Sequence, residues 1–298
     1  MKQLKMAVIG VAVLILATAA PVGAITYGEP DAGEHPYVGL MIFFDPSEPG
    51  WFSCSGTLLN ATVFLTAGHC TFNIGTDGEA EGSSGGNDVW VTVAPEDVLE
   101  GFPLRADYPD EATLYAARST WLNANPDYIK GTAFPSPLYD EFAAFPANHD
   151  VGVVVLAGAG IALGSYGELA PLGSVETLIA ASSPGRNDAL VETVGYGIQA
   201  IQPRPMNVDT RFKSTSRIVQ NKSNWVDGGN LHTLNNPSKV GGVGGSCFGD
   251  SGGPVFVNNT NDILAVVSFG PSATCHGADY SWRVDIGESQ EFVLPFLD

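Results

Sequence analysis

Short runs of apolar, β-branched and aromatic residues recur along the chain, and Gly, Pro, Asn and Asp separate them. Convincing helical periodicity is rare. Runs of this kind with such boundaries predict strands, so the pattern indicates an all-β protein, either a sandwich or a barrel. The last segment, Ile286–Leu297, alternates less and predicts a short C-terminal helix that Pro295 limits. The expected strands are Tyr37–Phe44, Ser55–Leu59, Val63–Thr66, Val89–Val93, Val151–Leu156, Val191–Gly195, Val255–Val257, Ile263–Phe269 and Tyr280–Val284.

Three segments between these runs lack a strand pattern. Asn73–Asp88 is rich in Gly, Ser and acidic residues and has no residues to bury in a core, and Gly101–Asn148 is long and irregular. We expect both to be surface loops. Ala157–Pro171 is rich in Gly and Ala, follows a strong strand, and is interpreted as the connector between two halves of the protein.

The N-terminus differs from the rest of the chain. Lys2 and Lys5 precede an uncharged apolar run, Met6–Ala20, and the following Pro21–Ala24 ends in small residues. This order is typical of a secretory signal peptide, so we expect residues 1–24 to be removed and the protein to be secreted. The alternative is an uncleaved membrane anchor, because the run approaches the length that spans a bilayer.

Composition adds a size and a charge. A chain of 298 residues suffices for one large domain or two small ones. Without residues 1–24, Lys+Arg falls from 13 to 11 against 32 Asp+Glu, so the net charge becomes 11 − 32 = −21. Such a surface repels nucleic acid and anionic membranes, so we expect neither as a partner.

Four cysteines give three possible pairings. An even number in an exported chain favours two disulfides, and the local pairs Cys54–Cys70 and Cys247–Cys275 are the simplest choice. No Cys-x-x-Cys or His/Cys cluster indicates a metal site.

A glycine-rich segment around a serine, Gly249–Pro254, carries the first chemical signal. A serine hydroxyl is a weak nucleophile unless a base takes its proton and donors stabilise the oxyanion that forms on attack. Glycines let the backbone turn tightly and present N–H groups to a bound carbonyl. The N–H groups of Gly249 and Ser251 are the candidates.

Two other segments supply a candidate base and a candidate acid. His69 follows a strand and stands beside Cys70, whose disulfide would limit the movement of the histidine. Asp150 heads the apolar run Val151–Leu156, where a buried carboxylate could fix the tautomer of an imidazole. Asp127 and Asp140 precede it, but neither heads an apolar strand.

The order His, Asp, Ser, with these flanking residues, resembles the chymotrypsin family of serine proteases. Cys247–Pro254 matches the family's Cys-x-Gly-Asp-Ser-Gly-Gly-Pro signature, and Thr66–Cys70 is a variant of its Thr-Ala-Ala-His-Cys. Val194–Gly197 resembles the Gly-Trp-Gly segment, and Ser268–Gly270 resembles the Ser-Trp-Gly strand that binds substrate backbone. The resemblance runs from Ile25 to the C-terminus and is weak in the two long loops.

The resemblance implies two six-stranded antiparallel β-barrels in a secreted, bacterial-type member. Residues 25–160 would form the first barrel with His69 and Asp150, and residues 161–298 the second with Ser251 and the substrate pocket. Ser251 would attack, His69 would transfer the proton, Asp150 would orient His69, and Gly249 and Ser251 would hold the oxyanion. Both local disulfides, Cys54–Cys70 and Cys247–Cys275, are implied, and neither a metal nor another cofactor is.

The resemblance also names partners and an activation step. We expect a monomer that acts on polypeptides, with protein protease inhibitors as further candidate partners. Family members are activated when a new N-terminal ammonium pairs with the Asp before the catalytic Ser, which here implies Ile25 and Asp250. Because Ile25 directly follows the expected cleavage site, signal peptidase itself would create the active terminus. Cleavage after Ala20 with later trimming is the alternative.

The family alignment also places the residues of the primary substrate pocket. A pocket specific for basic residues would carry Asp at the base, where this chain has Gly245, so we expect a neutral apolar residue before the scissile bond. A one-residue shift of the alignment would place Asp279 in the pocket and restore a preference for Lys or Arg. The expected pocket residues are Gly245, Ser246, Phe248, Ser268, Phe269, Gly270 and Ala278.

Two other functions stay open at this point. The chain could be a catalytically silent family member that acts as a secreted binding module, although silent members usually lose a triad residue. It could also be an esterase with the same nucleophile, and turnover of a peptide distinguishes the two activities.

Overall fold

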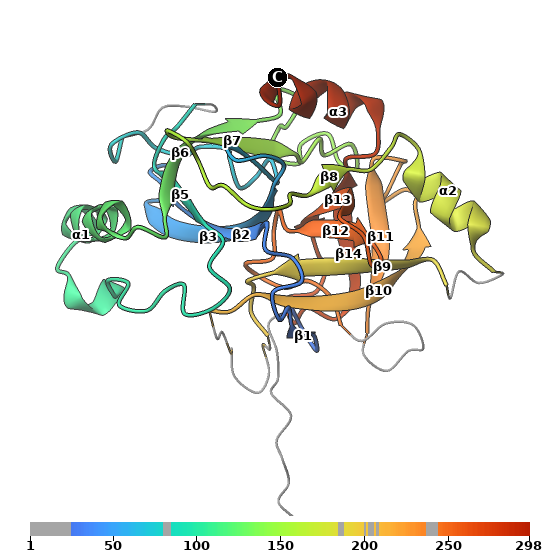
Figure 1. Cartoon of the computed structure of the whole chain (residues 1–298), viewed down its shortest axis with the longest axis horizontal. Coiled ribbons are helices and arrows are strands. Elements are labelled where there is room, and N and C mark those ends of the chain that lie inside the picture. The colour runs from blue at the N-terminus through green and yellow to red at the C-terminus, as the bar shows by residue number, and fades with distance from the viewer. Residues whose placement is uncertain are drawn as a thin grey trace, which may run out of the picture.

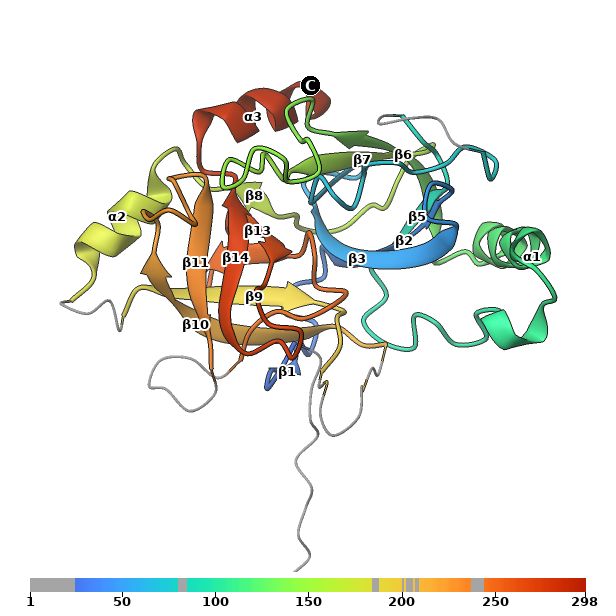
Figure 2. The same cartoon turned by 180° about the vertical axis from the view of Figure 1, so that it is seen from behind.

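The computed structural model describes residues 25–79, 85–183, 188–199, 201, 206, 209–236 and 244–298. The expected signal peptide, residues 1–24, lies outside the described residues. Two β-barrels lie side by side, and helices α1, α2 and α3 lie outside them (Figures 1 and 2). Within the described residues, none of the helices has the length and hydrophobicity that crossing a bilayer requires.

The first barrel closes on itself through six antiparallel strands, in the order β2-β3-β4-β7-β6-β5 and back to β2. The long β2–β3 hairpin starts it, and β7 crosses between β4 and β6. The strands are β2 (Val38–Asp45), β3 (Gly50–Leu58), β4 (Val63–Thr66), β5 (Val89–Thr92), β6 (Ile129–Pro135) and β7 (Gly152–Leu156).

The second barrel also has six antiparallel strands, because β9 pairs with both β10 and β12 and so closes the order β9-β10-β11-β14-β13-β12. Two short strands are added: β1 (Glu29–Pro30) on β10, and β8 (Glu168–Leu169) parallel to β13. The six are β9 (Leu190–Gly195), β10 (Phe212–Gln220), β11 (Asn230–Asn235), β12 (Pro254–Val257), β13 (Asp262–Phe269) and β14 (Gly277–Arg283). The expectation of two six-stranded barrels is therefore confirmed.

Strand β2 is buried on both faces, which explains why its sequence is apolar almost throughout. Met41 and Phe43 point into the main core, whereas Leu40 and Ile42 pack in a second cluster with Trp90 and Leu122. Because both faces are covered, the strand is apolar at almost every position and does not alternate.

The helices are short and peripheral. In α1 (Glu111–Ala124), Asp110 caps the first turn by accepting a hydrogen bond from the backbone N–H of Thr113 at 2.8 Å. Helix α2 is Ser174–Ala181, and α3 (Gly287–Val293) continues into the 3-10 turn Leu294–Phe296. A short C-terminal helix was expected, and its end packs on the first barrel, where the ring of Phe296 lies 5.3 Å from that of Phe134.

The two expected surface loops are only partly loops. The prediction that residues 73–88 bury nothing is wrong, because Ile74 is buried in the main core and Asp88 is fully buried. The prediction that residues 101–148 are irregular is also wrong, because they contain the 3-10 turn Arg105–Asp107, helix α1 and barrel strand β6. Leu114 and Leu122 anchor the helix to the protein.

Strands β10 and β11 were not predicted, and their polarity explains why. In β10 the buried positions alternate as in any half-buried strand, but two of them are Ser214 and Ser216. In β11 the buried set includes Thr233 and Asn235. A barrel interior lined partly by hydroxyl and amide groups does not give the alternation of apolar and polar residues that predicts a strand.

Candidate active site

Strand register brings His69 and Asp150 together although they are 81 positions apart. Strand β4 pairs with β7 so that Thr66 lies opposite Gly152. His69 stands three residues after Thr66, in the turn that follows β4, and Asp150 stands two residues before Gly152. The antiparallel pairing therefore places both side chains at the same end of the first barrel.

Asp150 is fully buried, and its carboxylate contacts the Nδ1 edge of the His69 ring. Its carboxylate accepts hydrogen bonds from the His69 backbone N–H at 2.8 Å and from the hydroxyl of Ser268 at 2.5 Å, and its Oδ2 lies 2.9 Å from Nδ1 of His69. Burial acts to raise the pKa of Asp150, but the charge of His69 and these hydrogen bonds outweigh it and hold the pKa below its ordinary value.

The contact with Asp150 shifts the pKa of His69 upward. Burial acts to lower the pKa of His69, but the carboxylate of Asp150 outweighs it and raises the pKa above its ordinary value. The side chain of His69 is still 25 % exposed, so the ring edge opposite Nδ1 is open to the cleft. Nδ1 faces the carboxylate, which leaves Nε2 for a partner on the cleft side.

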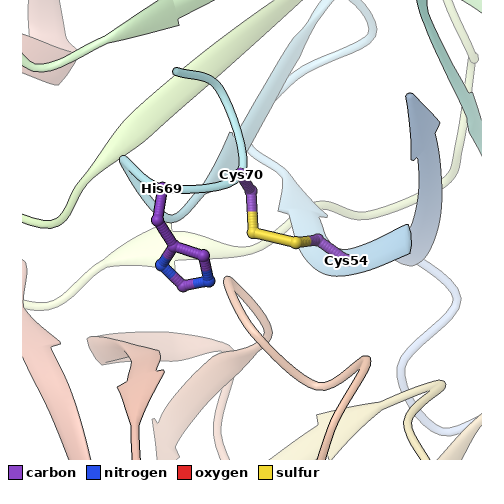
Figure 3. A group of neighbouring side chains, drawn as sticks. All are labelled: Cys54, His69 and Cys70. Atoms are coloured by element: carbon purple, nitrogen blue, oxygen red, sulfur yellow. A yellow bond between two sulfur atoms is a disulfide. The ribbon is translucent and has the colours of Figure 1, made fainter. Parts of the chain in front are cut away.

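The disulfide Cys54–Cys70 lies directly beside His69 and joins its turn to β3 (Figure 3). The three side chains come close enough to hold a metal ion, within 4.8 Å of one another. Both sulfur atoms are bonded to each other, however, and a disulfide sulfur is not the thiolate that binds metals. The second implied disulfide, Cys247–Cys275, is also present, so the expected pairing is confirmed.

Ser251 lies in a turn that only glycine neighbours permit. Gly249 has φ +98° and Gly252 has φ +76°. A Cβ on Gly252 would lie 2.0 Å from Oγ1 of Thr66, which belongs to the other barrel. Among the described residues, no acceptor takes a hydrogen bond from the N–H of Gly249 or Ser251. Both N–H groups are therefore free to donate to a bound carbonyl.

A residue that the sequence did not single out, Ser55, ties this turn to the first barrel. The N–H of Ser55 on β3 donates to the carbonyl of Ser251 at 2.8 Å, and its hydroxyl donates to the carbonyl of Gly249 at 2.9 Å. The same hydroxyl accepts from the N–H of Tyr196 at 2.9 Å. These bonds fix the serine turn relative to the barrel that carries His69.

Asp250 is fully buried. Its carboxylate accepts from the N–H groups of Gly197 at 2.8 Å and Cys247 at 2.9 Å. Burial raises the pKa of Asp250 to about 7. Among the described residues, no cation forms an ion pair with it.

Ile25 is also fully buried, and successive contacts connect it with the neighbours of Asp250. It packs on Phe212, which pairs with Gly195 across β10 and β9. Gly195 lies directly against the carboxylate, because a Cβ there would be 2.3 Å from Oδ1 of Asp250. Phe212 and its strand partner Gly195 thus lie between Ile25 and the buried carboxylate.

Two cavities meet at Ser251. One, of about 550 Å³, is lined by His69, Ser251 and Gly249 and extends past Phe52 to the carboxylates of the β2–β3 turn. The other, of about 430 Å³, opens on the far side of Ser251 and lies within the second barrel's loops. Among the described residues, no hydrogen bond joins the hydroxyl of Ser251 to His69, so they are related by the cavity that they share.

The second cavity contains nearly all residues that were expected to form the substrate pocket. Gly245 does not line it; Asp279 does, and a Cβ on Gly245 would lie 2.5 Å from the carboxylate of Asp279. The expected Ala278 and the alternative Asp279 both line the cavity. The expected residues that line the cavity are Ser246, Phe248, Ser268, Phe269, Gly270 and Ala278.

An aromatic group that the sequence did not predict lies beside the cleft. Phe142, from the long segment before Asp150, has its ring 6.2 Å from that of His69 and 6.0 Å from that of Phe269. Phe269 in turn stacks on Tyr280 at 4.8 Å. The segment thus reaches the active site, which its irregular sequence did not indicate.

A sequence model of one protein family, Trypsin, matches residues 120–286, which is more than half of the chain. The chain belongs to the trypsin family. It is therefore a trypsin-like serine protease, and polypeptides are its substrates. The match includes Asp150 and Ser251 and begins after His69.

A solved structure supports the trypsin-family fold. The structure described as HL collagenase aligns with a TM-score of 0.59 and 15 % identity, over 92 % of this chain and 98 % of that one. At this identity the likeness shows the two-barrel architecture and no more. No curated protein matches the chain.

Proposed function

We propose that this trypsin-family protease cleaves peptide bonds with His69, Asp150 and Ser251 as its catalytic triad. The observation that carries the proposal is the buried Asp150 carboxylate on Nδ1 of His69, at the edge of a cavity that His69 and Ser251 share. The residue types and their order His, Asp, Ser along the chain also support the proposal.

The proposed reaction follows from which atoms are available. Oγ of Ser251 forms a bond to the peptide carbonyl carbon while Nε2 of His69 takes its proton. His69 then gives that proton to the leaving nitrogen, and the carbon–nitrogen bond breaks. Water repeats the two steps and releases the acyl group from Ser251. Asp150 keeps Nδ1 protonated and stabilises the imidazolium that forms between them.

The N–H groups of Gly249 and Ser251 are proposed to hold the oxyanion. Both belong to the turn that Ser55 anchors, so their direction is set before a substrate binds. Preorganised donors of this kind are effective because they need no rearrangement during the reaction, and losing one costs about 10²–10³ in rate.

The primary pocket supports two kinds of side chain, depending on pH. Its walls are largely apolar, which supports the neutral apolar preference that the sequence predicted. Its carboxylate, Asp279, favours the alternative. Burial raises the pKa of Asp279 to about 6, so it is ionised at neutral pH. We therefore propose a preference for Lys or Arg above about pH 6 and for apolar residues below it.

We further propose secretion with cleavage before Ile25, so that the new ammonium pairs with Asp250. The buried carboxylate, which pairs with no cation among the described residues, and the buried Ile25 support this proposal. N-terminal sequencing of the protein from the culture medium tests it. A stable terminus other than Ile25 would exclude signal peptidase as the activating enzyme.

The experiment for the proposed function is hydrolysis of an internally quenched peptide by the secreted protein. We expect turnover that Ser251→Ala and His69→Ala both abolish. Cleavage of esters without cleavage of peptides would indicate an esterase. Absence of both activities in a chain that begins at Ile25 would indicate a catalytically silent binding protein.

A further inference from the structure

Among the described residues, the buried carboxylate at the base of the primary pocket has hydrogen-bond donors from Asn235 and Ser246 and forms no ion pair. Asp279 is 6 % exposed and lines the cavity that ends at Ser251. Its Oδ1 accepts a hydrogen bond from Nδ2 of Asn235 at 2.9 Å, and its Oδ2 accepts one from the N–H of Ser246 at 2.6 Å. No described Lys, Arg or His forms an ion pair with it.

The strand register explains how Asn235 reaches the pocket. Asn235 ends β11 and lies opposite Gly277 on β14, so Asp279 is its diagonal neighbour on the same face. The space between them exists because residue 245 is glycine. A Cβ there would lie 2.3 Å from Cγ of Asn235 and 2.5 Å from Oδ2 of Asp279.

The orientation of the Asn235 amide is determined by its surroundings. Its NH₂ group faces two acceptors, the carboxylate of Asp279 and the carbonyl of Ser246 at 3.0 Å. Its oxygen faces the hydroxyl of Thr26 at 3.2 Å. A flipped amide would turn its oxygen toward both acceptors, so only one orientation is stable. Asn235 is fully buried, so water cannot replace it.

We propose that Asn235 is a positioning residue that keeps the carboxylate of Asp279 charged and directed into the primary pocket, and thereby sets the preference for Lys or Arg over apolar side chains. Asn235 does not line the cavity itself and acts through Asp279. The inference rests on the proposed function, because it concerns the substrate pocket of the same protease.

The forces on Asp279 are balanced closely enough for one hydrogen bond to matter. Burial favours the neutral carboxyl, whereas Asn235 and the N–H of Ser246 favour the anion. The charge of Asp279 in turn acts to raise the pKa of Asp250. The side chain of Ser246 also favours the anion, and Thr26 holds the other end of the Asn235 amide.

The test is a pH profile of selectivity. Two internally quenched peptides that differ only in Arg or Phe before the scissile bond are compared from pH 5 to pH 9 by their ratio of kcat/KM. Both reactions use His69, so its titration cancels in the ratio and the profile reports the free-enzyme ionisation of the pocket. The wild-type ratio is expected to rise with pH and to level off above neutrality.

The variant is Asn235→Leu, which keeps the size of the side chain and removes the donor. Its midpoint is expected to move up by about one pH unit, so the Arg/Phe ratio at pH 7 falls about twofold. Asn221→Leu is the matched control, because it removes a buried amide that donates to Glu176 at 3.0 Å, away from the pocket. Its ratio is expected to follow the wild type. Asn235→Ser retains a shorter donor and should shift the midpoint in the same direction by less.

The possible results distinguish the role proposed for Asn235 from the role proposed for Asp279. A wild-type midpoint that neither Asn235 variant moves would overturn the role of Asn235 and leave the pocket proposal standing. A flat wild-type ratio, with both peptides cleaved, would overturn the role of Asp279 as well as that of Asn235. Failure to cleave either peptide would count against the proposed endopeptidase itself.

Discussion

The pairing of a free Ile25 ammonium with Asp250 predicts a large difference in stability between two versions of the chain. The perturbation is one extra Ala before Ile25, compared with a chain that begins at Ile25. Both are made with Ser251→Ala to prevent self-digestion. The extra residue moves the ammonium away from the carboxylate and leaves Asp250 buried without a cation, as among the described residues here.

The magnitude follows from the pKa of Asp250. Burial raises it from 3.8 to about 7, and each pKa unit corresponds to about 1.4 kcal/mol, so ionising Asp250 costs the fold about 4 kcal/mol. A raised pKa means that the extended chain is most stable at low pH and loses this amount as pH rises through 7. In the chain that begins at Ile25, the ammonium compensates the charge, and the loss is largely absent.

Thermal unfolding between pH 4 and pH 8.5 measures the difference. The two chains should unfold at similar temperatures near pH 4, and near pH 8 the extended chain should unfold roughly 10 °C lower. Asp250→Asn in the extended chain is the control and should remove the part of the pH-dependent loss that Asp250 causes. Asp279 also has a raised pKa, but it is present in both chains, so its contribution cancels. Identical pH profiles for the two chains would refute the reasoning.

Three further outcomes follow from the site. Asp150→Asn should lower kcat by about 10⁴, because Nδ1 of the histidine loses the acceptor that fixes its tautomer; steady-state kinetics above neutral pH measure this. Ser268→Ala removes a donor to Asp150, so we expect kcat to fall by about tenfold with little change in KM. Replacing Cys54 and Cys70 together by Ala should lower the free energy of unfolding by about 3 kcal/mol in denaturant titrations, whereas an unchanged midpoint would mean that the turn needs no covalent anchor.

The chemistry-bearing residues could be predicted because their motifs are local. The glycines around Ser251 are required by φ values that other residues rarely adopt, so the turn is written into the sequence. The proximity of His69 and Asp150 could be expected because each adjoins an apolar strand, although only the β4–β7 register fixes it.

The elements that the sequence did not predict either bury polar side chains or lie within a long insertion. Strands β10 and β11 bury Ser214, Ser216 and Asn235, so they lack the apolar alternation that predicts a strand. Helix α1 lies in a segment whose irregular composition resembles a loop, and packing through Leu114 and Leu122 anchors it to the protein.

Which residue forms the base of the primary pocket depends on the alignment of a single position with the family. Ala278 and Asp279 both line the pocket, so a shift of one residue in the family alignment exchanges an apolar side chain for a carboxylate at its base. The sequence alone could not decide this, because the deciding contacts come from Asn235 on another strand and from the missing side chain at Gly245. Both residues are distant in sequence from Asp279.

The central claim is that Ser251 is a nucleophile activated by His69. Intact-mass spectrometry of the secreted protein, before and after a fluorophosphonate probe, tests it most directly. The account predicts one adduct on a chain that begins at Ile25, and no adduct after Ser251→Ala or His69→Ala. A chain with this terminus and both disulfides that takes up no probe would contradict it.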